Sequence, residues 1–334
     1  MDSILNQTLH NIEIICVNDG STDESLAILE EYSAKDERIR IINQKNSGLS
    51  VARNVGMKNA NAEEYIGFVD SDDWIEPDTY ELAYKAIKEN MADMVCWYAQ
   101  IEFEYNSQVN KNDIQRVKEY HKIKNTGFHL VSDSIFNFCT VTTWNKLYRK
   151  SLIEKYNISF PVGLIHEDVE FFYKYALICK NIYFIDKYLT HYLQRVDSLV
   201  WKQIINKNKL IVDRIKIMIR LYNYFVENDL LSKYKKTIAD ALIWYCFVEE
   251  CKLNSKENQL KIYKYASTVV KEMDLTQLDD SNNILYNLKR EKYWPIFLFF
   301  LAEDIKKKLR KRLIYRLLRK IYHKYFHNTI QIKK

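Results

Sequence analysis

The stretch EYIGFVDSDDWIEPD, residues 64–78, decides the fold, because an apolar strand in it runs directly into a cluster of acids. The apolar part is typical of a strand that is buried on both faces. Asp70, Asp72 and Asp73 follow within four residues, and Pro77 stands where a helix would begin. Carboxylates this close repel one another, and a bound divalent cation would remove that repulsion.

The same alternation of strand and helix continues on both sides of this stretch. Apolar strands are predicted over 12–17, 38–43 and 92–99, and helices over 47–60 and from Pro77 to about Asn90. Ser21 with Glu24 three residues later predicts a capping box that opens a further helix. This order predicts an α/β fold, Rossmann-like, with a mostly parallel sheet and flanking helices, in which ligands bind beyond the carboxyl ends of the strands.

The pattern changes in the second half of the chain. Residues 100–165 are irregular, 166–179 predict a helix, 181–195 a strand or strand pair, and the periodicity beyond about residue 200 is helical. We therefore predict a first domain over residues 1–200, an α-helical region over 201–302 and a basic amphipathic tail over 303–334.

The tail carries the positive charge of the chain. Residues 305–334 hold twelve Lys and Arg and no acid, so the remainder has a net charge of −6 although the whole chain has +6. Apolar residues recur every four positions there, which favours a helix lying on an anionic membrane surface. A terminal helix packed on the protein, with a solvated basic face, is the alternative. Nucleic-acid binding is disfavoured because the segment lacks spread stacking aromatics.

The composition and the cysteines point to a cytoplasmic globular protein. The chain is 47% hydrophobic and 28% charged, which is ordinary for a folded domain. Its six cysteines are scattered without metal-ligand spacing and predict buried thiols in a reducing cytoplasm. No secretory signal and no apolar run of about 18 residues is found, so we expect peripheral attachment at the inner face of the plasma membrane.

Four polar clusters could carry chemistry, and each also has a structural explanation. Asp19 ends a strand and could accept hydrogen bonds from a base or ribose, or simply lie in a turn. Arg53 could bind a diphosphate bidentately or be a solvated helix residue. The acids of 70–73 could hold Mg²⁺ or Mn²⁺, or cap the following helix. Glu167 and Asp168 could interact with a helix dipole or supply a general base.

Five segments, taken together and in order, resemble glycosyltransferase family 2: CVNDGSTDES, NQKNSGLSVARNVGMKNA, YIGFVDSDDWIEPD, TTWNKLYRK and HEDVEFF. The resemblance covers residues 1 to about 200. It implies a GT-A fold and an inverting sugar transferase. Members of the family normally begin with one further strand, which is central in the sheet. We therefore expect either a start upstream of Met1 or a truncated form that folds poorly or binds donor weakly.

The resemblance implies a role for each matching residue of the nucleotide site. Asp19 resembles the acid that contacts the base, and Arg53 the arginine beside the nucleotide. Asp70 and Asp72 resemble the D-x-D pair, with Asp70 nearer the ribose, Asp72 nearer a Mn²⁺ or Mg²⁺ cofactor, and Asp73 in support.

The resemblance also implies the catalytic and acceptor residues. Asp168 resembles the catalytic base, and Glu167 stands next to it. Four further residues fall in blocks that border the acceptor site or a closing loop: Trp144, Lys146, His191 and Arg195.

The implied function is transfer of a hexose or N-acetylhexosamine from a UDP-linked donor to a glycan or lipid-linked acceptor, in surface polysaccharide or lipooligosaccharide synthesis. The expected partners are that donor, that acceptor and an anionic membrane through 303–334, with no nucleic acid. Two alternatives stay open. A sugar nucleotidyltransferase on a related fold is disfavoured because no Gly-rich phosphate loop is present. The other is an inactive truncated partner protein or pseudogene product of the same fold.

Overall fold

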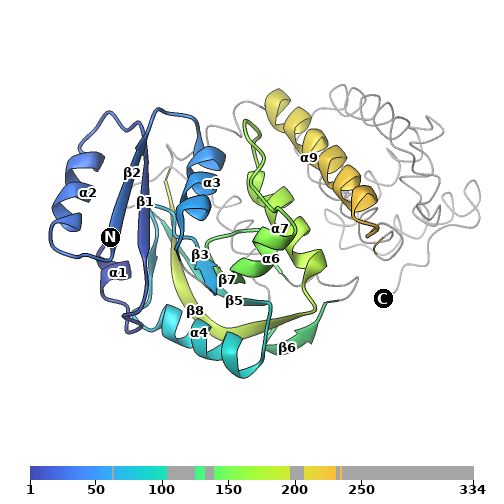
Figure 1. The fold of residues 1–334 in the computed structure, drawn as a ribbon, viewed down its shortest axis with the longest axis horizontal. Coiled ribbons are helices and arrows are strands. Elements are labelled where there is room, and N and C mark those ends of the chain that lie inside the picture. The colour runs from blue at the N-terminus through green and yellow to red at the C-terminus, as the bar shows by residue number, and fades with distance from the viewer. Residues whose placement is uncertain (62–63, 104–124, 132–138, 196–206, 231–233, 235–334) are drawn as a thin grey trace, which may run out of the picture. The chain divides into compact units, whose positions relative to one another are not determined.

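The computed structural model describes residues 1–61, 64–103, 125–131, 139–195, 207–230 and 234. The chain divides into two units, Met1–Leu210 and Ile211–Lys334. The first unit contains all the described strands and every site residue predicted above (Figure 1). The second contains most of α9 (Lys207–Glu227), so the predicted helical region begins with a helix, while the tail over 303–334 lies outside the described residues.

A parallel pair of strands opens the sheet structure. Strand β1 (Ile14–Asp19) lies beside β2 (Ile39–Gln44), with Ile14 opposite Ile39 and Asp19 opposite Gln44. Three helices accompany this pair, α1 (Asp2–Leu5), α2 (Ser25–Ser33) and α3 (Leu49–Asn59). Because parallel strands end at the same edge, the polar residues at their carboxyl ends lie side by side.

A second sheet has the strand order β3-β7-β5-β8-β4, with β6 also paired to β8. Its strands are β3 (Tyr65–Gly67), β4 (Trp74–Ile75), β5 (Met94–Phe103), β6 (Gly127–Leu130), β7 (Lys146–Arg149) and β8 (Asn181–Gln194). The β5–β8 pair is parallel, whereas β3, β4, β6 and β7 join antiparallel. The α/β class is confirmed, and each antiparallel pairing involves one of three short strands, β4, β6 and β7, that the sequence pattern did not indicate.

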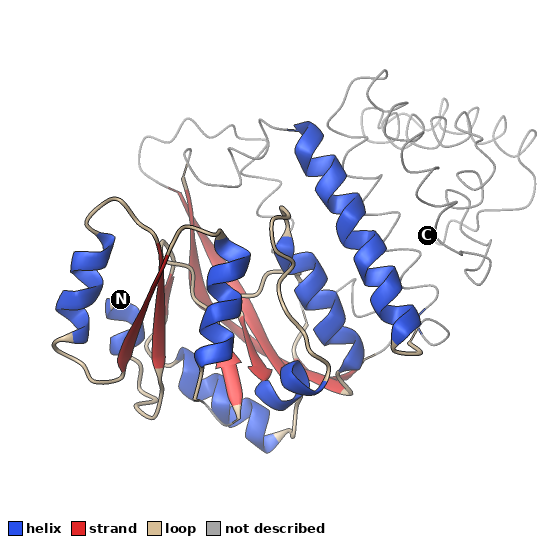
Figure 2. Ribbon diagram, turned by 45° about the horizontal axis from the view of Figure 1, so that its top comes forward, coloured by secondary structure: helices blue, strands red, loops and turns tan. Residues whose placement is uncertain are grey.

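Helices flank the strands (Figure 2). Buried apolar side chains of these helices form part of the core. Helix α4 (Thr79–Glu89) buries Ala83 and Ile87 against Trp97 of β5. The short α6 (Lys150–Lys155) precedes α7 (Glu167–Ile178), in which every residue from Val169 to Leu177 is buried. Burying a large apolar side chain contributes about 1.5–3 kcal/mol. The packing of α7 therefore fixes the position of the acids in its first turn.

The predicted capping box is wrong. Helix α2 begins only at Ser25, and no side chain caps it. The backbone N–H of Ser21 instead donates to Asn18 Oδ1 at 3.1 Å. The physical reason is the turn at Gly20, whose φ of +70° favours glycine and where a Cβ would lie 2.7 Å from the Asn46 nitrogen. This turn takes Ser21 away from the start of the helix.

Three other predictions were tested by the structure. The segment 181–195 forms one long strand, β8, not a pair. Cys96, Cys139 and Cys179 are free buried thiols, as predicted, while Cys16 is half-buried and Cys246 and Cys251 lie outside the described residues. Among the described helices, none has the length and apolar character needed to cross a bilayer.

Candidate active site

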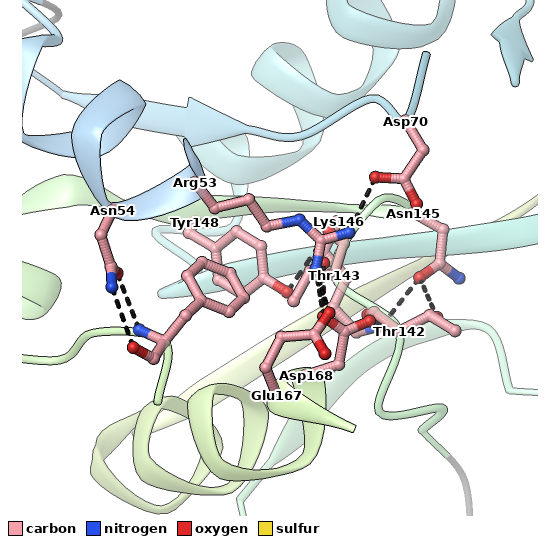
Figure 3. Close-up of polar contacts among 11 residues, drawn as sticks. Arg53, Asn54, Asp70, Thr142, Thr143, Asn145, Lys146, Tyr148, Glu167 and Asp168 are labelled. Atoms are coloured by element: carbon pink, nitrogen blue, oxygen red, sulfur yellow. Dashed lines mark hydrogen bonds and ion pairs between the residues drawn. The ribbon is translucent and has the colours of Figure 1, made fainter. Parts of the chain in front are cut away.

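Arg53 lies at the centre of the site and joins three carboxylates from different parts of the chain (Figure 3). Its Nη2 lies 2.7 Å from Asp70 Oδ1, and its Nη1 lies 2.9 Å from Glu167 Oε1 and 2.5 Å from Asp168 Oδ1. The guanidinium also lies over the ring of Phe160, with its carbon 5.3 Å from the ring centroid. We call Arg53, Asp70, Glu167 and Asp168 the Arg53 cluster. It connects α3, the end of the β3 segment and the start of α7.

Asn54, the next residue of α3, joins this helix to the segment that contains Phe160. Its Nδ2 donates to the Phe160 carbonyl at 2.9 Å, and the Phe160 N–H donates back to its Oδ1 at 2.8 Å. The Phe160 ring in turn stacks on Phe171 of α7, with centroids 4.1 Å apart. Arg53 and Asn54, which are consecutive residues of α3, therefore both connect this helix to α7. Arg53 does so through its ion pairs with Glu167 and Asp168, and Asn54 through its bonds to the backbone of Phe160.

The Arg53 cluster contains three acids and one cation, and its electrostatics follow from that imbalance. Burial raises the pKa of Glu167 to about 7, repulsion from Asp168 adds to the rise, and Arg53 opposes it. Burial also raises the pKa of Asp168, again against the attraction of Arg53. Burial opposes the charge of Arg53 itself, yet the three carboxylates raise its pKa further. The cluster consequently attracts a proton or a further cation near neutral pH.

Asp168 is held in a defined orientation at the start of α7. Its Oδ1 accepts hydrogen bonds from Arg53 and, at 3.3 Å, from the hydroxyl of the fully buried Thr143. Among the residues that the structure describes, no hydrogen bond reaches its Oδ2, and the side chain is 20% exposed. One oxygen therefore fixes the carboxylate while the other stays available. Thr143 lies in the segment TTWNKLYRK, but no feature of the sequence pattern pointed to this residue.

The acidic turn, residues 70–73, sends its carboxylates to three different partners. Asp70 faces Arg53, Asp72 Oδ2 lies 2.7 Å from Arg195 Nη2, and Asp73 Oδ1 accepts the Leu193 N–H at 2.9 Å. Asp73 Oδ2 is buried and has no hydrogen-bond partner within the described part of the chain. Burial raises the pKa of Asp73 to about 8, the Leu193 bond opposes this, and repulsion from the other two acids adds to it.

The acidic turn fits a divalent ion that also binds substrate. No group of three or more His, Cys, Asp or Glu suited to a metal was found among the described residues. Asp70 and Asp72 each have one oxygen engaged by an arginine, which leaves the second oxygen of each for an ion. Mg²⁺ is commonly held by only one or two carboxylates, with substrate phosphates and water completing the shell. Two acids are therefore enough.

The side chain of Asp19 is hydrogen-bonded to the last residue of β2 and to the loop that follows it. Its Oδ1 accepts from Gln44 Nε2 at 2.7 Å and from the Ser47 N–H at 2.8 Å, and its Oδ2 accepts from the Gly48 N–H at 2.7 Å. Slight burial opposes the effect, but these bonds lower the pKa of Asp19. The Asp19 carboxylate thus holds the loop before α3. A nucleotide base that bound to Asp19 would share its carboxylate with the N–H groups of that loop.

The four residues expected near the acceptor lie in two different places. Trp144 and Lys146 are in the core, where Lys146 is fully buried, donates to Asn145 Oδ1 at 2.8 Å and lies over the Phe172 ring. Both side chains are buried, so neither is exposed to an acceptor in this structure. His191 and Arg195 instead lie on and just after β8, next to the acidic turn.

Comparison with known proteins identifies relatives of the chain. Residues 1–156 match the family model described as Glycosyl transferase family 2. EpsH of Bacillus subtilis, which is named a glycosyltransferase by assignment only, is 33% identical over 257 residues, which are 76% of this chain and 72% of EpsH. A cholesterol galactosyltransferase of Borreliella burgdorferi is 31% identical over 239 residues, 70% of this chain and 65% of that protein. The glycosyltransferase GlyA of Streptococcus pneumoniae is 37% identical over 217 residues, 61% of this chain but 30% of GlyA.

A solved structure is similar over the whole chain. The crystal structure of S. aureus TarS 1–349 in complex with UDP-GlcNAc aligns with a TM-score of 0.65 and 20% identity, covering 100% of this chain and 89% of TarS 1–349. At this identity the likeness concerns the fold. The predicted GT-A fold is confirmed.

Proposed function

The chain belongs to glycosyl transferase family 2 and is a glycosyltransferase; from this premise we propose that it transfers a sugar from a UDP-linked donor with inversion at the anomeric carbon. We further propose that Asp168 is the general base. The observation that carries the proposal is the Arg53 cluster. It brings the carboxylate of Asp168, of which only Oδ1 is bonded among the described residues, next to an acidic turn suited to a diphosphate and its cation.

Asp168 has the properties that a base for an acceptor hydroxyl needs. Its pKa is raised by burial, and a base works best when its pKa is close to the working pH. Its Oδ1 is held by Arg53 and Thr143, so Oδ2 is the atom that accepts the proton. Glu167, whose pKa is about 7, also pairs with Arg53. It therefore shares the attraction of the guanidinium, which acts to lower the pKa of Asp168.

The transfer is a single displacement. The acceptor hydroxyl oxygen bonds to the anomeric carbon, the bond from that carbon to the diphosphate oxygen breaks, and the hydroxyl proton passes to Asp168. The nucleoside diphosphate leaves with the bonding electron pair. A bound Mn²⁺ or Mg²⁺, held by Asp72 and Asp70, would neutralise part of the charge on the leaving group.

Arg195 is better placed than Arg53 to contact the diphosphate. The Arg53 side chain is 8% exposed and its terminal nitrogens already bind three acids. The Arg195 side chain is 37% exposed and pairs with Asp72. A guanidinium with exposed N–H groups can bind phosphate oxygens in pairs. We assign Arg53 to positioning Asp168 and Asp70, and Arg195 to the leaving group.

The donor and acceptor classes follow from the relatives and stay part of the proposal. TarS has been crystallised with UDP-GlcNAc and with UDP, which supports a UDP-linked hexose or N-acetylhexosamine. The name of the Borreliella relative specifies a sterol as acceptor, which supports a lipid-linked or glycan acceptor at a membrane. We propose a cytoplasmic location with attachment to the inner membrane face through 303–334.

Release of UDP from a panel of UDP-sugars, with membrane extract as acceptor source, tests this function. We expect release that EDTA abolishes and Mn²⁺ restores. Asp168→Asn should abolish transfer and retain donor binding, whereas Asp72→Asn should weaken Mn²⁺-supported donor binding. Asp78→Asn, which removes only an exposed pair with Lys187, is the matched control. Full activity of Asp168→Asn would remove it as the base. Absence of UDP release would favour the inactive-partner alternative, and pyrophosphate release from a nucleoside triphosphate would favour a nucleotidyltransferase.

A further inference from the structure

Alternate residues at the end of β8 and just after it contact the acidic turn and β4, which follows the turn. Arg195 pairs with Asp72, and the Leu193 N–H donates to Asp73. His191 lies opposite Trp74 in the β4–β8 register, and their rings stack with centroids 5.0 Å apart and planes within 6°. The end of β8 therefore follows the turn residue by residue.

The imidazole of His191 is enclosed by two carboxylates. Its Nε2 lies 2.7 Å from Glu76 Oε1, just after β4, and its Nδ1 lies 3.0 Å from Glu102 Oε1 on β5. A neutral imidazole has a proton on only one nitrogen, so the other would face a carboxylate oxygen without a donor between them. Only the protonated ring satisfies both contacts. Partial burial opposes the charge, but the two glutamates raise the pKa of His191.

The acidic turn depends on this contact because β4 is very short. Strand β4 has two residues and, of the strands that the structure describes, pairs with β8 alone, through Trp74 opposite His191 and Ile75 opposite Thr190. The Glu76 N–H adds one bond to the Leu189 carbonyl at 2.9 Å. Arg53 anchors the beginning of the turn and Arg195 its middle. At its end, Gln7 Nε2 donates to the Glu76 carbonyl at 2.7 Å and the Thr8 N–H to the Pro77 carbonyl at 2.9 Å, so His191 supplies the charged contact beside these backbone anchors.

We propose that protonated His191 is a positioning residue for donor binding: by clamping Glu76 and Glu102 and stacking on Trp74, it holds β4 in place and so fixes Asp72 for the diphosphate and its cation. The inference rests on the proposed function. The groups that face the ring are Glu76 beyond β4, Glu102 on β5 and the indole of Trp74. Loss of the proton leaves two carboxylates beside a neutral ring and loosens the end of the turn.

The sign of the pH effect follows from the raised pKa. The clamp is fully present below the ordinary pKa of histidine, about 6.5, and is lost as the pH rises through the higher folded-state value. We therefore expect Mn²⁺-supported UDP binding to weaken as the pH rises. A carboxylate pair held by a permanent cation would not show this loss.

The test is calorimetric binding of UDP with Mn²⁺ to the full chain, between about pH 6 and 9, where histidine titrates. His191→Gln should bind about tenfold more weakly at low pH, where a charged hydrogen-bonded group is lost, and should not weaken further with pH. His191→Arg keeps a planar cation that can stack on the indole, so it should retain affinity and lose the pH dependence. His129→Gln, on β6, which pairs with the opposite end of β8 at Asn181–Phe184, is the control and should behave like the wild type.

The outcomes separate this inference from the proposed function. Titration of UDP itself is common to all variants, so affinities are compared with the wild type at each pH. If the wild type binds UDP and His191→Gln binds equally with the same pH profile, the positioning role is overturned and the function stands. If the wild type binds no UDP with Mn²⁺, both are overturned. Should His191→Gln not fold, Glu102→Gln replaces it: the pH-dependent loss should then begin at lower pH, and an unchanged profile would overturn the role.

Discussion

Replacing Arg53 by methionine should destabilise the first unit strongly, and by an amount that depends on pH. The substitution removes one cation from three carboxylates whose side chains are only 13–28% exposed. Breaking a buried ion pair by removing one partner costs about 3–5 kcal/mol. Because the acids keep some contact with water, we expect the lower end, about 3 kcal/mol, or roughly 6–12 °C in Tm.

The pH dependence of this loss identifies its cause. Arg53 opposes the raised pKa values of Glu167 and Asp168, so without it both pKa values rise further above their unfolded values. Such acids destabilise the folded state above their raised pKa, and this effect disappears as the pH falls and they bind protons. The loss should therefore be full at about pH 8 and much smaller at about pH 5.

Urea denaturation of wild type and variant at both pH values measures this difference. Lys88→Met is the matched control, because Lys88 also pairs with an acid at 2.9 Å but both side chains are nearly half exposed. An exposed pair contributes about 0–1 kcal/mol, so this control should change little at either pH. An Arg53→Met loss no larger than that of Lys88→Met, or equal at both pH values, would refute the reasoning.

Three further predictions concern other parts of the chain. Thr143→Val should lower kcat several-fold and leave the Kd for UDP unchanged, because the hydroxyl orients only Asp168; parallel changes in both constants would contradict this. Asp19→Asn should reduce the loss of stability on acidification: the lowered pKa of Asp19 means that its contribution is present above about pH 4 and is lost below it, which circular dichroism during acid titration would measure. Deletion of 303–334 should abolish flotation with anionic vesicles, since each Lys or Arg near such a surface contributes about 1 kcal/mol, and unchanged flotation would disprove the membrane role of the tail.

The sequence predicted the elements that follow a simple period. The strands β1, β2 and β5 and the helices α3, α4 and α7 lie within a few residues of the apolar patterns that indicated them. The ends of the strands also pointed to Asp19 and Asp70 as polar residues where a ligand would bind, and the start of α7 pointed to Asp168. Strand β7 was not predicted, because Lys146, its first residue, is charged; the strand joins the sheet by pairing with β3 and β5.

The partners of Arg53 could not be predicted from the sequence. They lie 17, 114 and 115 residues away, so no local spacing indicates them. A lone arginine on a helix is more often solvated, and what turns this one inward is the packing of Phe160 and α7 beneath it. The contacts of His191 were missed for the same reason, since Glu76 and Glu102 come from separate strands.

The Arg53 cluster has an evolutionary consequence. A single guanidinium balances acids from three segments, so each of these positions constrains the substitutions acceptable at the others. A homologue that loses the arginine should also have lost an acid at the position of Asp70 or Glu167, or have acquired a cation nearby. Covariation of these columns across an alignment would record that dependence.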